Sequence, residues 1–178
     1  MPRINTPALD TATGAAAEVF GQIKKAVGSV PNTYAAIGFA APAALKAMLA
    51  ADGVVAASSL NKGDQETIRL LVSAVVGCDY CVAAHSLLGK MAGLSPDALR
   101  QIRAGDLTGD TKRDALIRFV KLLTSTTGTI DQSEYTAIRA AGYTDQQLVE
   151  ISLAIAAITF TNVFNRINDT TIDFPAVN

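Results

Sequence analysis

The sequence contains no tryptophan, only two cysteines and a single histidine among its 178 residues. Charge is also scarce and balanced, because 15 Lys and Arg residues face 16 Asp and Glu residues and together they make up 17% of the chain. This balance excludes the basic surface that binds nucleic acid, so we expect no nucleic-acid partner. A chain of this length buries about 70% of its unfolded surface, and its core therefore needs no disulfide or metal.

Long apolar runs are absent as well. The longest strongly apolar stretch, Ile151 to Phe160, is interrupted by Ser152 and Thr159, whereas a membrane-spanning helix needs about 20 apolar residues. The first residues also lack the apolar run of a signal peptide. We therefore expect no membrane partner and a reducing, cytoplasmic location. In such a compartment, two cysteines are more typical of catalytic, redox or metal-binding roles than of a permanent disulfide.

The dominant periodicity is helical, and no stretch alternates with a period of two residues, so the sequence predicts an all-α, single-domain helical bundle over residues 1–178. Helices are expected over residues 64–76, 78–93 and 144 to about 168, with Gly77 between the first two. The first has a buried face that includes Ile68, Leu71 and Val72, and the last opens on a capping box, Thr144-Asp-Gln-Gln147. Asn32 is a candidate N-cap, and the tail from residue 170 should be irregular. The mean hydropathy of +0.28 indicates surplus apolar surface that sister subunits could cover.

Both cysteines and the only histidine lie within the segment Cys78-Asp-Tyr-Cys81-Val-Ala-Ala-His85. On a helix, positions 78, 81 and 85 share one face, and residues 81 and 85 are neighbours about 5–6 Å apart. Such spacing suits a thiol and its acid–base partner. A helix N-terminus lowers a thiol pKa and favours Cys78, whereas the histidine favours Cys81, and the negative charge of Asp79 opposes both. The residues alone leave the choice of nucleophile open, with the histidine favouring Cys81.

Glu66 is the candidate partner of the histidine. If Gly77 reverses the chain, helices on either side of it form an antiparallel pair. The rise per residue then places Glu66 and His85 about 4–5 Å apart along the helix axis, near enough to meet. If the helices instead continue in line, the carboxylate is out of reach.

The spacing Glu66, eleven residues, then Cys78-x-x-Cys81-x-x-x-His85 resembles the signature of alkyl hydroperoxidase D-like proteins in the carboxymuconolactone decarboxylase superfamily. Three flanking segments resemble the peroxidase-related branch of that superfamily: Val30-Pro31-Asn32, Asn162-x-Phe164-Asn165 and Asp173-Phe174-Pro175. Tyr80 stands where some members have a second histidine. The true lactone decarboxylases lack the paired cysteines, so the resemblance does not imply decarboxylation.

The resemblance implies an all-helical fold in a homo-oligomer, a trimer or hexamer, that reduces hydroperoxides with thiols. It implies four catalytic residues: Cys81 as the peroxidatic cysteine, Cys78 as the resolving one, His85 as the proton relay and Glu66 as the base behind it. We expect no cofactor, because no flavin or nicotinamide motif is present, and no bound metal, because three of the possible ligands crowd one helix. Electrons would then come from an external dithiol or a protein thiol.

Two alternatives use the same cluster. In the first, two thiolates, the imidazole and the Glu66 carboxylate are four zinc ligands, although structural zinc sites usually draw their ligands from two separated pairs. In the second, the protein is a non-catalytic redox sensor whose disulfide is recognised by a partner.

Overall fold

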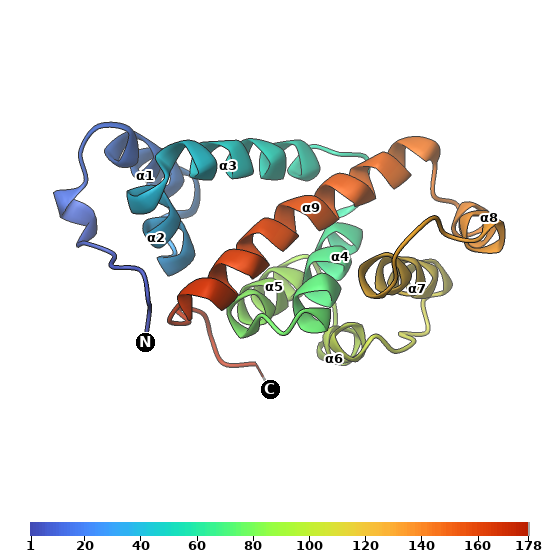
Figure 1. Ribbon diagram of the computed structural model, residues 1–178. Coiled ribbons are helices and arrows are strands. Elements are labelled where there is room, and N and C mark those ends of the chain that lie inside the picture. Colours follow the sequence, from blue (N-terminus) through green and yellow to red (C-terminus); the bar gives the residue numbers. More distant parts are fainter. Residues whose placement is uncertain (178) are drawn as a thin grey trace.

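The computed structural model describes residues 1–177, and helices are the only regular structure in that range (Figure 1). The expected all-α fold is therefore confirmed. The elements in chain order are the 3-10 helix η1 Leu9–Thr11 and the α-helices α1 Gly14–Val27, α2 Asn32–Ala40, α3 Pro42–Ala56, α4 Lys62–Val75, α5 Asp79–Met91, α6 Pro96–Ala104, α7 Thr111–Ser125, α8 Gln132–Ala140 and α9 Asp145–Asn168.

Helix α4 lies at the centre of the fold and contacts α5, α6, α7 and α9. Its apolar residues Ile68, Leu71 and Val72 are buried, as their spacing predicts. The surrounding helices also bury polar residues of α4, namely Asp64, Gln65, Glu66, Thr67 and Ser73. Burying a charge without a partner is costly. A carboxylate on α4 must therefore be paired inside the protein.

Helix α9 crosses the molecule diagonally in Figure 1 and packs against α2, α3, α4 and α5. It begins with the expected capping box, formed by Thr144 and Gln147. By length and composition alone it could cross a membrane, with a mean hydropathy of 1.5 over 18 residues. Its buried face nevertheless carries Asn162, Asn165 and Asn168, which hydrogen-bond inside the protein. In this fold one face of α9 packs inside the protein, and 28% of its most apolar 18-residue window is buried.

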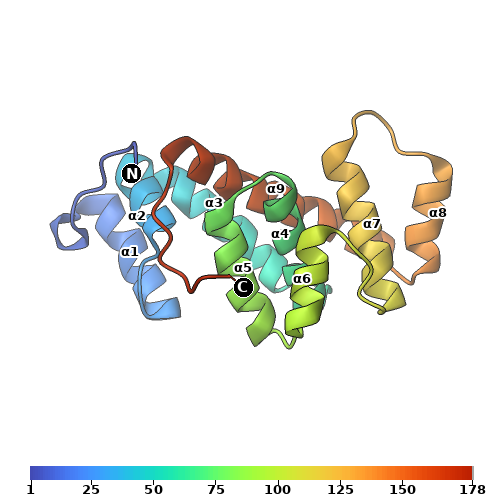
Figure 2. The same ribbon diagram turned by 90° about the horizontal axis from the view of Figure 1, so that it is seen from below.

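The start of helix α2 differs from the prediction by one residue. Asn32 is the first helical residue and Pro31 is the N-cap. Because proline has no side-chain oxygen to accept the free helix N–H groups, a distant residue does so: the Asp173 carboxylate accepts a hydrogen bond from the Asn32 N–H at 2.9 Å. The Asn32 side chain donates to the Thr171 carbonyl at 3.0 Å. The C-terminal segment is thereby held between α2 and α5 (Figure 2).

The two ends of the described chain lie on the same side of the molecule (Figure 1). The Arg3 N–H donates to the Asn168 carbonyl at 2.8 Å, and the Met1 ammonium pairs with Asp169 at 2.9 Å. After α9 the tail is irregular as far as residue 177, as expected, and Asn178 lies outside the described residues.

Gly89 lies one turn beyond His85 where α5 passes close to α4 and α6. A Cβ at this position would come within 2.7 Å of Leu99, 3.2 Å of Leu94 and 3.8 Å of the Glu66 Cβ. The glycine inside a helical pattern is therefore explained by close packing rather than by a helix end. This packing keeps α5 near the carboxylate-bearing face of α4.

We expect Gly89→Ala to destabilise the protein by about 1–3 kcal/mol, because the new methyl group overpacks this contact. The matched control is Gly53→Ala on α3, where a Cβ would meet nothing within 4 Å. That change should stabilise the helix by up to about 1 kcal/mol. Urea unfolding of both variants measures the difference, and equal stability of the two would contradict the packing argument.

Candidate active site

The α4–α5 pair brings Glu66 and His85 together. Gly77 has a φ of 70°, a left-handed conformation that suits glycine, and lies between the two helices. The Glu66 Oε2 and His85 Nδ1 atoms are 2.8 Å apart. The expected antiparallel meeting of these two side chains is therefore confirmed. Because Nδ1 is used in this contact, the other ring nitrogen is free to exchange a proton with a reacting group.

The two cysteines are adjacent, but not in the way that a continuous helix predicts. Cys78 has an extended backbone and is the N-cap of α5, so it lies just outside the helix that carries Cys81 and His85. Its sulfur accepts a hydrogen bond from the backbone N–H of Cys81 at 3.4 Å. Both thiols are free and buried. The N-cap position therefore gives Cys78 the contact with the helix N-terminus that lowers a thiol pKa.

The two thiols differ in acidity. The pKa of Cys78 is lowered, chiefly because the Cys81 thiol donates a hydrogen bond to its sulfur, and burial only partly opposes this effect. The pKa of Cys81 is raised by the same hydrogen bond and by burial. The pair therefore loses its first proton as a unit, with the negative charge on Cys78 and the remaining proton on Cys81.

Asn165 of α9 is a site residue that the sequence did not single out for chemistry. Its Nδ2 atom donates to the Cys81 sulfur at 3.2 Å, and its Oδ1 atom accepts from the Thr33 hydroxyl at 2.8 Å. Thr33 thereby fixes which end of the amide faces the sulfur. A donor at this distance stabilises negative charge on Cys81. The available signal was its place in the segment Asn162-x-Phe164-Asn165, which resembles the peroxidase-related branch.

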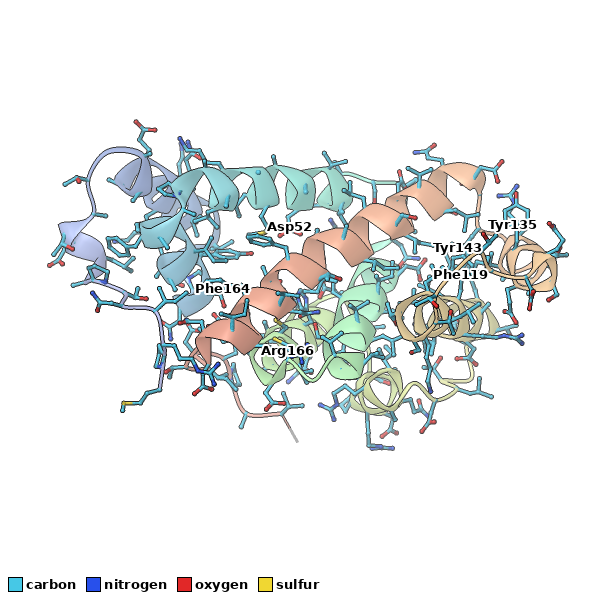
Figure 3. The ribbon with its side chains drawn as sticks, in the orientation of Figure 1. Asp52, Phe119, Tyr135, Tyr143, Phe164 and Arg166 are labelled. Atoms are coloured by element: carbon cyan, nitrogen blue, oxygen red, sulfur yellow. The ribbon has the colours of Figure 1, made fainter. Side chains whose placement is uncertain are left out.

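A partly buried ion-pair network supports Glu66. Arg69 Nη1 is 3.0 Å from the second Glu66 oxygen, and Arg69 Nη2 is 3.2 Å from Asp52 Oδ1. Burial raises the pKa of Glu66, but the contacts with His85 and Arg69 outweigh it, so the pKa lies below its ordinary value. Asp52 reaches into the space between α3 and α9 (Figure 3). Neither Arg69 nor Asp52 was found from the sequence, because the contact between α3 and α4 is tertiary.

Replacing Arg69 by methionine should cost about 3–5 kcal/mol of stability, because two carboxylates on α3 and α4 would lose their buried cation. A folded-state pKa below the unfolded value adds stability at neutral pH, and this contribution is lost as the pH falls through the folded pKa. Without Arg69 the Glu66 pKa rises toward its unfolded value, so the acid-induced loss of stability from this carboxylate should be smaller than in the wild type. Urea unfolding at neutral and mildly acidic pH measures both effects.

The matched control for this prediction is Lys46→Met, which removes an exposed ion pair with Glu18 at 3.2 Å. It should cost about 1 kcal/mol or less, because water screens exposed pairs. Similar losses in the two variants would contradict a supporting role for the partly buried network.

Cys81 and His85 line one pocket of about 250 Å³, which we call the His85 pocket. Most of its wall is apolar or aromatic. The other lining residues are Val27, Ser29, Pro31, Thr33, Tyr34, Tyr80, Ala84, Leu88, Thr161, Asn165 and Phe174. The pocket therefore combines a thiol, an imidazole and a surface suited to an organic group.

The C-terminal segment supplies part of this wall. The Tyr80 hydroxyl donates to the Asp173 carboxylate at 2.7 Å and accepts the Thr33 N–H at 3.3 Å. The Phe174 ring packs edge-on against Tyr80 with 5.4 Å between centroids. Tyr80 thus binds the C-terminal segment to the site.

The zinc alternative gains no support from the geometry. Within residues 1–177, no group of three or more His, Cys, Asp or Glu side chains is arranged to hold a metal ion. The Glu66 carboxylate is instead occupied by His85 and Arg69. The Cys78 sulfur accepts a hydrogen bond from the Cys81 N–H, and this contact requires no metal ion.

Comparisons with known proteins agree with this fold. Residues 42–116 match the model of the carboxymuconolactone decarboxylase family. A peroxidase-related protein from Ralstonia eutropha with an alkylhydroperoxidase AhpD core superposes with a TM-score of 0.84 at 20% identity, over 97% of this chain and 92% of that one. Among curated proteins, none matches the sequence.

Two further solved structures are similar. A protein of unknown function from Agrobacterium tumefaciens, described as a putative antioxidant defence protein AhpD, has a TM-score of 0.69 at 26% identity, over 76% of this chain and 94% of that one. A debrominase in complex with 2,3,4-tribromopyrrole has a TM-score of 0.80 at 17% identity, over 96% of this chain and 91% of that one. The shared fold therefore occurs in proteins described by more than one activity.

Proposed function

We propose that this chain is a member of the carboxymuconolactone decarboxylase superfamily and a thiol-dependent peroxidase that reduces organic hydroperoxides. The match of residues 42–116 to the family model and the AhpD-like fold support this proposal. One observation carries the proposal: Cys81 and His85 share an apolar pocket, and the buried Glu66 holds the histidine by its Nδ1 atom. A thiol, a proton carrier and an orienting carboxylate are the parts that nucleophilic thiol chemistry requires.

Proton transfer begins the reaction. His85 accepts the first proton of the thiol pair, and the Glu66 carboxylate stabilises the imidazolium. When the proton shared by the two sulfurs lies on Cys78, the charge lies on Cys81, next to the substrate and the Asn165 amide. Cys81 is the attacking sulfur because it lines the His85 pocket together with the proton donor.

The thiolate then attacks the O–O bond. An S–O bond forms on Cys81, the alkoxide leaves, and His85 returns the proton to it, which gives an alcohol and a sulfenic acid. The neighbouring Cys78 thiol displaces water from the sulfenic acid, and a Cys78–Cys81 disulfide results. The net reaction consumes two thiols and one hydroperoxide and gives a disulfide, an alcohol and water. An external dithiol or protein thiol restores the dithiol by exchange.

The proposal includes a homo-oligomer in a reducing, cytoplasmic setting. Exposed residues at helical spacing form one stripe along α9, with Val149, Phe160, Val163 and Ile167 as its large apolar members. In the proposed trimer or hexamer, a second copy of the chain packs on this stripe. Sedimentation of the wild type and of Phe160→Glu would test that placement.

A thiol count tests the redox chemistry. One equivalent of cumene hydroperoxide should oxidise both thiols, so the count of free thiols per chain should fall from two to none. Sustained peroxide consumption with dithiothreitol would identify a catalyst, whereas a single slow oxidation would identify the redox sensor. Two thiols that persist in excess peroxide would refute both.

Reductive dehalogenation is a second candidate, and the aromatic wall formed by Tyr34, Tyr80 and Phe174 favours it. The same two thiols could replace a ring bromine by hydrogen, which would release bromide and form the disulfide. Incubation with 2,3,4-tribromopyrrole and dithiothreitol, with bromide as the readout, compares this reaction with peroxide reduction.

A further inference from the structure

The two cysteines of the dithiol line different cavities. Cys81 lines the His85 pocket, whereas Cys78 lines a second cavity of about 170 Å³, which we call the Cys78 pocket. Tyr80 and Asn165 line both cavities and therefore form the wall between them. The other lining residues of the Cys78 pocket are Gly77, Asp79, Arg166, Asp169, Thr170 and Ile172.

The backbone explains this separation. Cys78 is the N-cap residue and lies outside the helix, so its side chain leaves the chain before α5 begins. Cys81 lies in the first turn and belongs to the face that carries His85. The end of α9 closes the Cys78 pocket from the other side, where Arg166 is labelled in Figure 3.

The two cavities also differ in character. The His85 pocket is mostly apolar and aromatic. The Cys78 pocket instead has the charged residues Asp79, Arg166 and Asp169 in its wall. An apolar substrate therefore fits the first cavity better, and a polar, hydrogen-bonding molecule fits the second.

We propose that the Cys78 pocket is the entry site of the reductant, a polar dithiol, and that the two halves of the reaction use separate openings. This proposal rests on the proposed dithiol function. A thiolate of the reductant attacks the Cys78 sulfur of the disulfide and forms a mixed disulfide. The bonding pair of the broken S–S bond passes to the Cys81 sulfur.

Each leaving thiolate meets a donor that is already in place. The Cys81 thiolate accepts the Asn165 amide at 3.2 Å and takes a proton from His85. The second thiol of the reductant then displaces Cys78, whose thiolate accepts the Cys81 N–H at 3.4 Å. The protein regains two thiols, and the reductant leaves as a disulfide. Attack on Cys81 instead would bring the reductant into the pocket that the oxidising substrate occupies.

Two exposed aliphatic residues allow a crossed test. Ile172 lines the Cys78 pocket but not the His85 pocket. Leu88 lines the His85 pocket but not the Cys78 pocket. Each is replaced by tryptophan to obstruct its own cavity. The protein is oxidised with diamide, and its reduction by dithiothreitol is followed by stopped flow. In a separate arm, the reduced protein is oxidised with cumene hydroperoxide.

Ile172→Trp should slow reduction by about tenfold or more, since obstructed alignment of reacting groups costs at least that much, and should slow oxidation far less. Leu88→Trp should slow oxidation by cumene hydroperoxide more than it slows reduction by dithiothreitol. Reduction of Ile172→Trp at the wild-type rate, or slower reduction of Leu88→Trp than of Ile172→Trp, would overturn the proposal. Because diamide supplies the disulfide, the reductive arm stands even if peroxide is not the substrate.

A trapping experiment locates the attacked sulfur directly. The diamide-oxidised protein is treated with excess glutathione, quenched in acid and mapped by mass spectrometry. Glutathione on Cys78 is the expected result, and glutathione on Cys81 would overturn the proposal. In the crossed test, Ile172→Trp and Leu88→Trp are first checked for folding by circular dichroism. The disulfide of Ile172→Ala, which widens the Cys78 pocket, should be reduced by dithiothreitol at least as fast as that of the wild type.

Discussion

Cys81→Ser should abolish hydroperoxide consumption, with a loss on the order of 10³-fold or more, because a serine hydroxyl cannot replace the attacking thiolate. Cys78→Ser should behave differently. It keeps the attacking sulfur in the His85 pocket, so it should react once with peroxide to give a sulfenic acid and then stop. The measurements are peroxide consumption with dithiothreitol and dimedone labelling of the sulfenic acid.

The pair of variants distinguishes two assignments that the structure sets against each other. The pKa directions make Cys78 the more acidic thiol of the pair, whereas the proposed substrate pocket is lined by Cys81. Dimedone labelling of Cys81→Ser, without labelling of Cys78→Ser, would show that acidity rather than access selects the nucleophile. Thermal unfolding of both variants serves as the folding control.

His85→Ala should lower the rate of peroxide reduction by about 10²- to 10⁴-fold, because the first proton of the thiol pair would have no acceptor and the alkoxide no donor. Added imidazole should restore part of the activity, since the deletion enlarges a cavity that already measures about 250 Å³. Rescue would identify a chemical role, because a purely structural defect does not respond to free imidazole.

The control for this variant is Leu88→Ala, which lies on the same helix and lines the same pocket. It should raise KM for cumene hydroperoxide with little change in kcat, because it removes contact area and no proton carrier. A His85→Ala protein that turns over at the wild-type rate would remove the histidine from the mechanism.

The helices that carry the chemistry were predictable because their information is local. Apolar spacing indicated α4, the capping box marked the start of α9, and the rise per residue placed Glu66 opposite His85. The 2.8 Å contact between those two side chains follows from a single assumption, a chain reversal at Gly77. The shared position of Cys78, Cys81 and His85 was only partly right, because Cys78 is a cap rather than a helical residue.

The remaining site residues come from segments far away in the chain. Asn165 reaches Cys81 across 84 residues, and Asp173 reaches Tyr80 across 93. Arg69 was close in sequence to Glu66, but its second partner, Asp52, comes from α3. No periodicity reports such contacts, because they depend on the packing of helices whose order in space the sequence pattern does not specify.

By itself, the sequence determined an all-helical chain and a compact group of two thiols and one imidazole, since helical geometry sets the spacing of residues only a few turns apart. It placed the Glu66 carboxylate beside that group only on the condition that the chain reverses at Gly77. The tertiary structure alone decided the ionisation of that group and the access to it. Both depend on which buried charges, amides and aromatic rings the distant helices and the C-terminal segment place around the sulfurs, and desolvation makes each of those neighbours count.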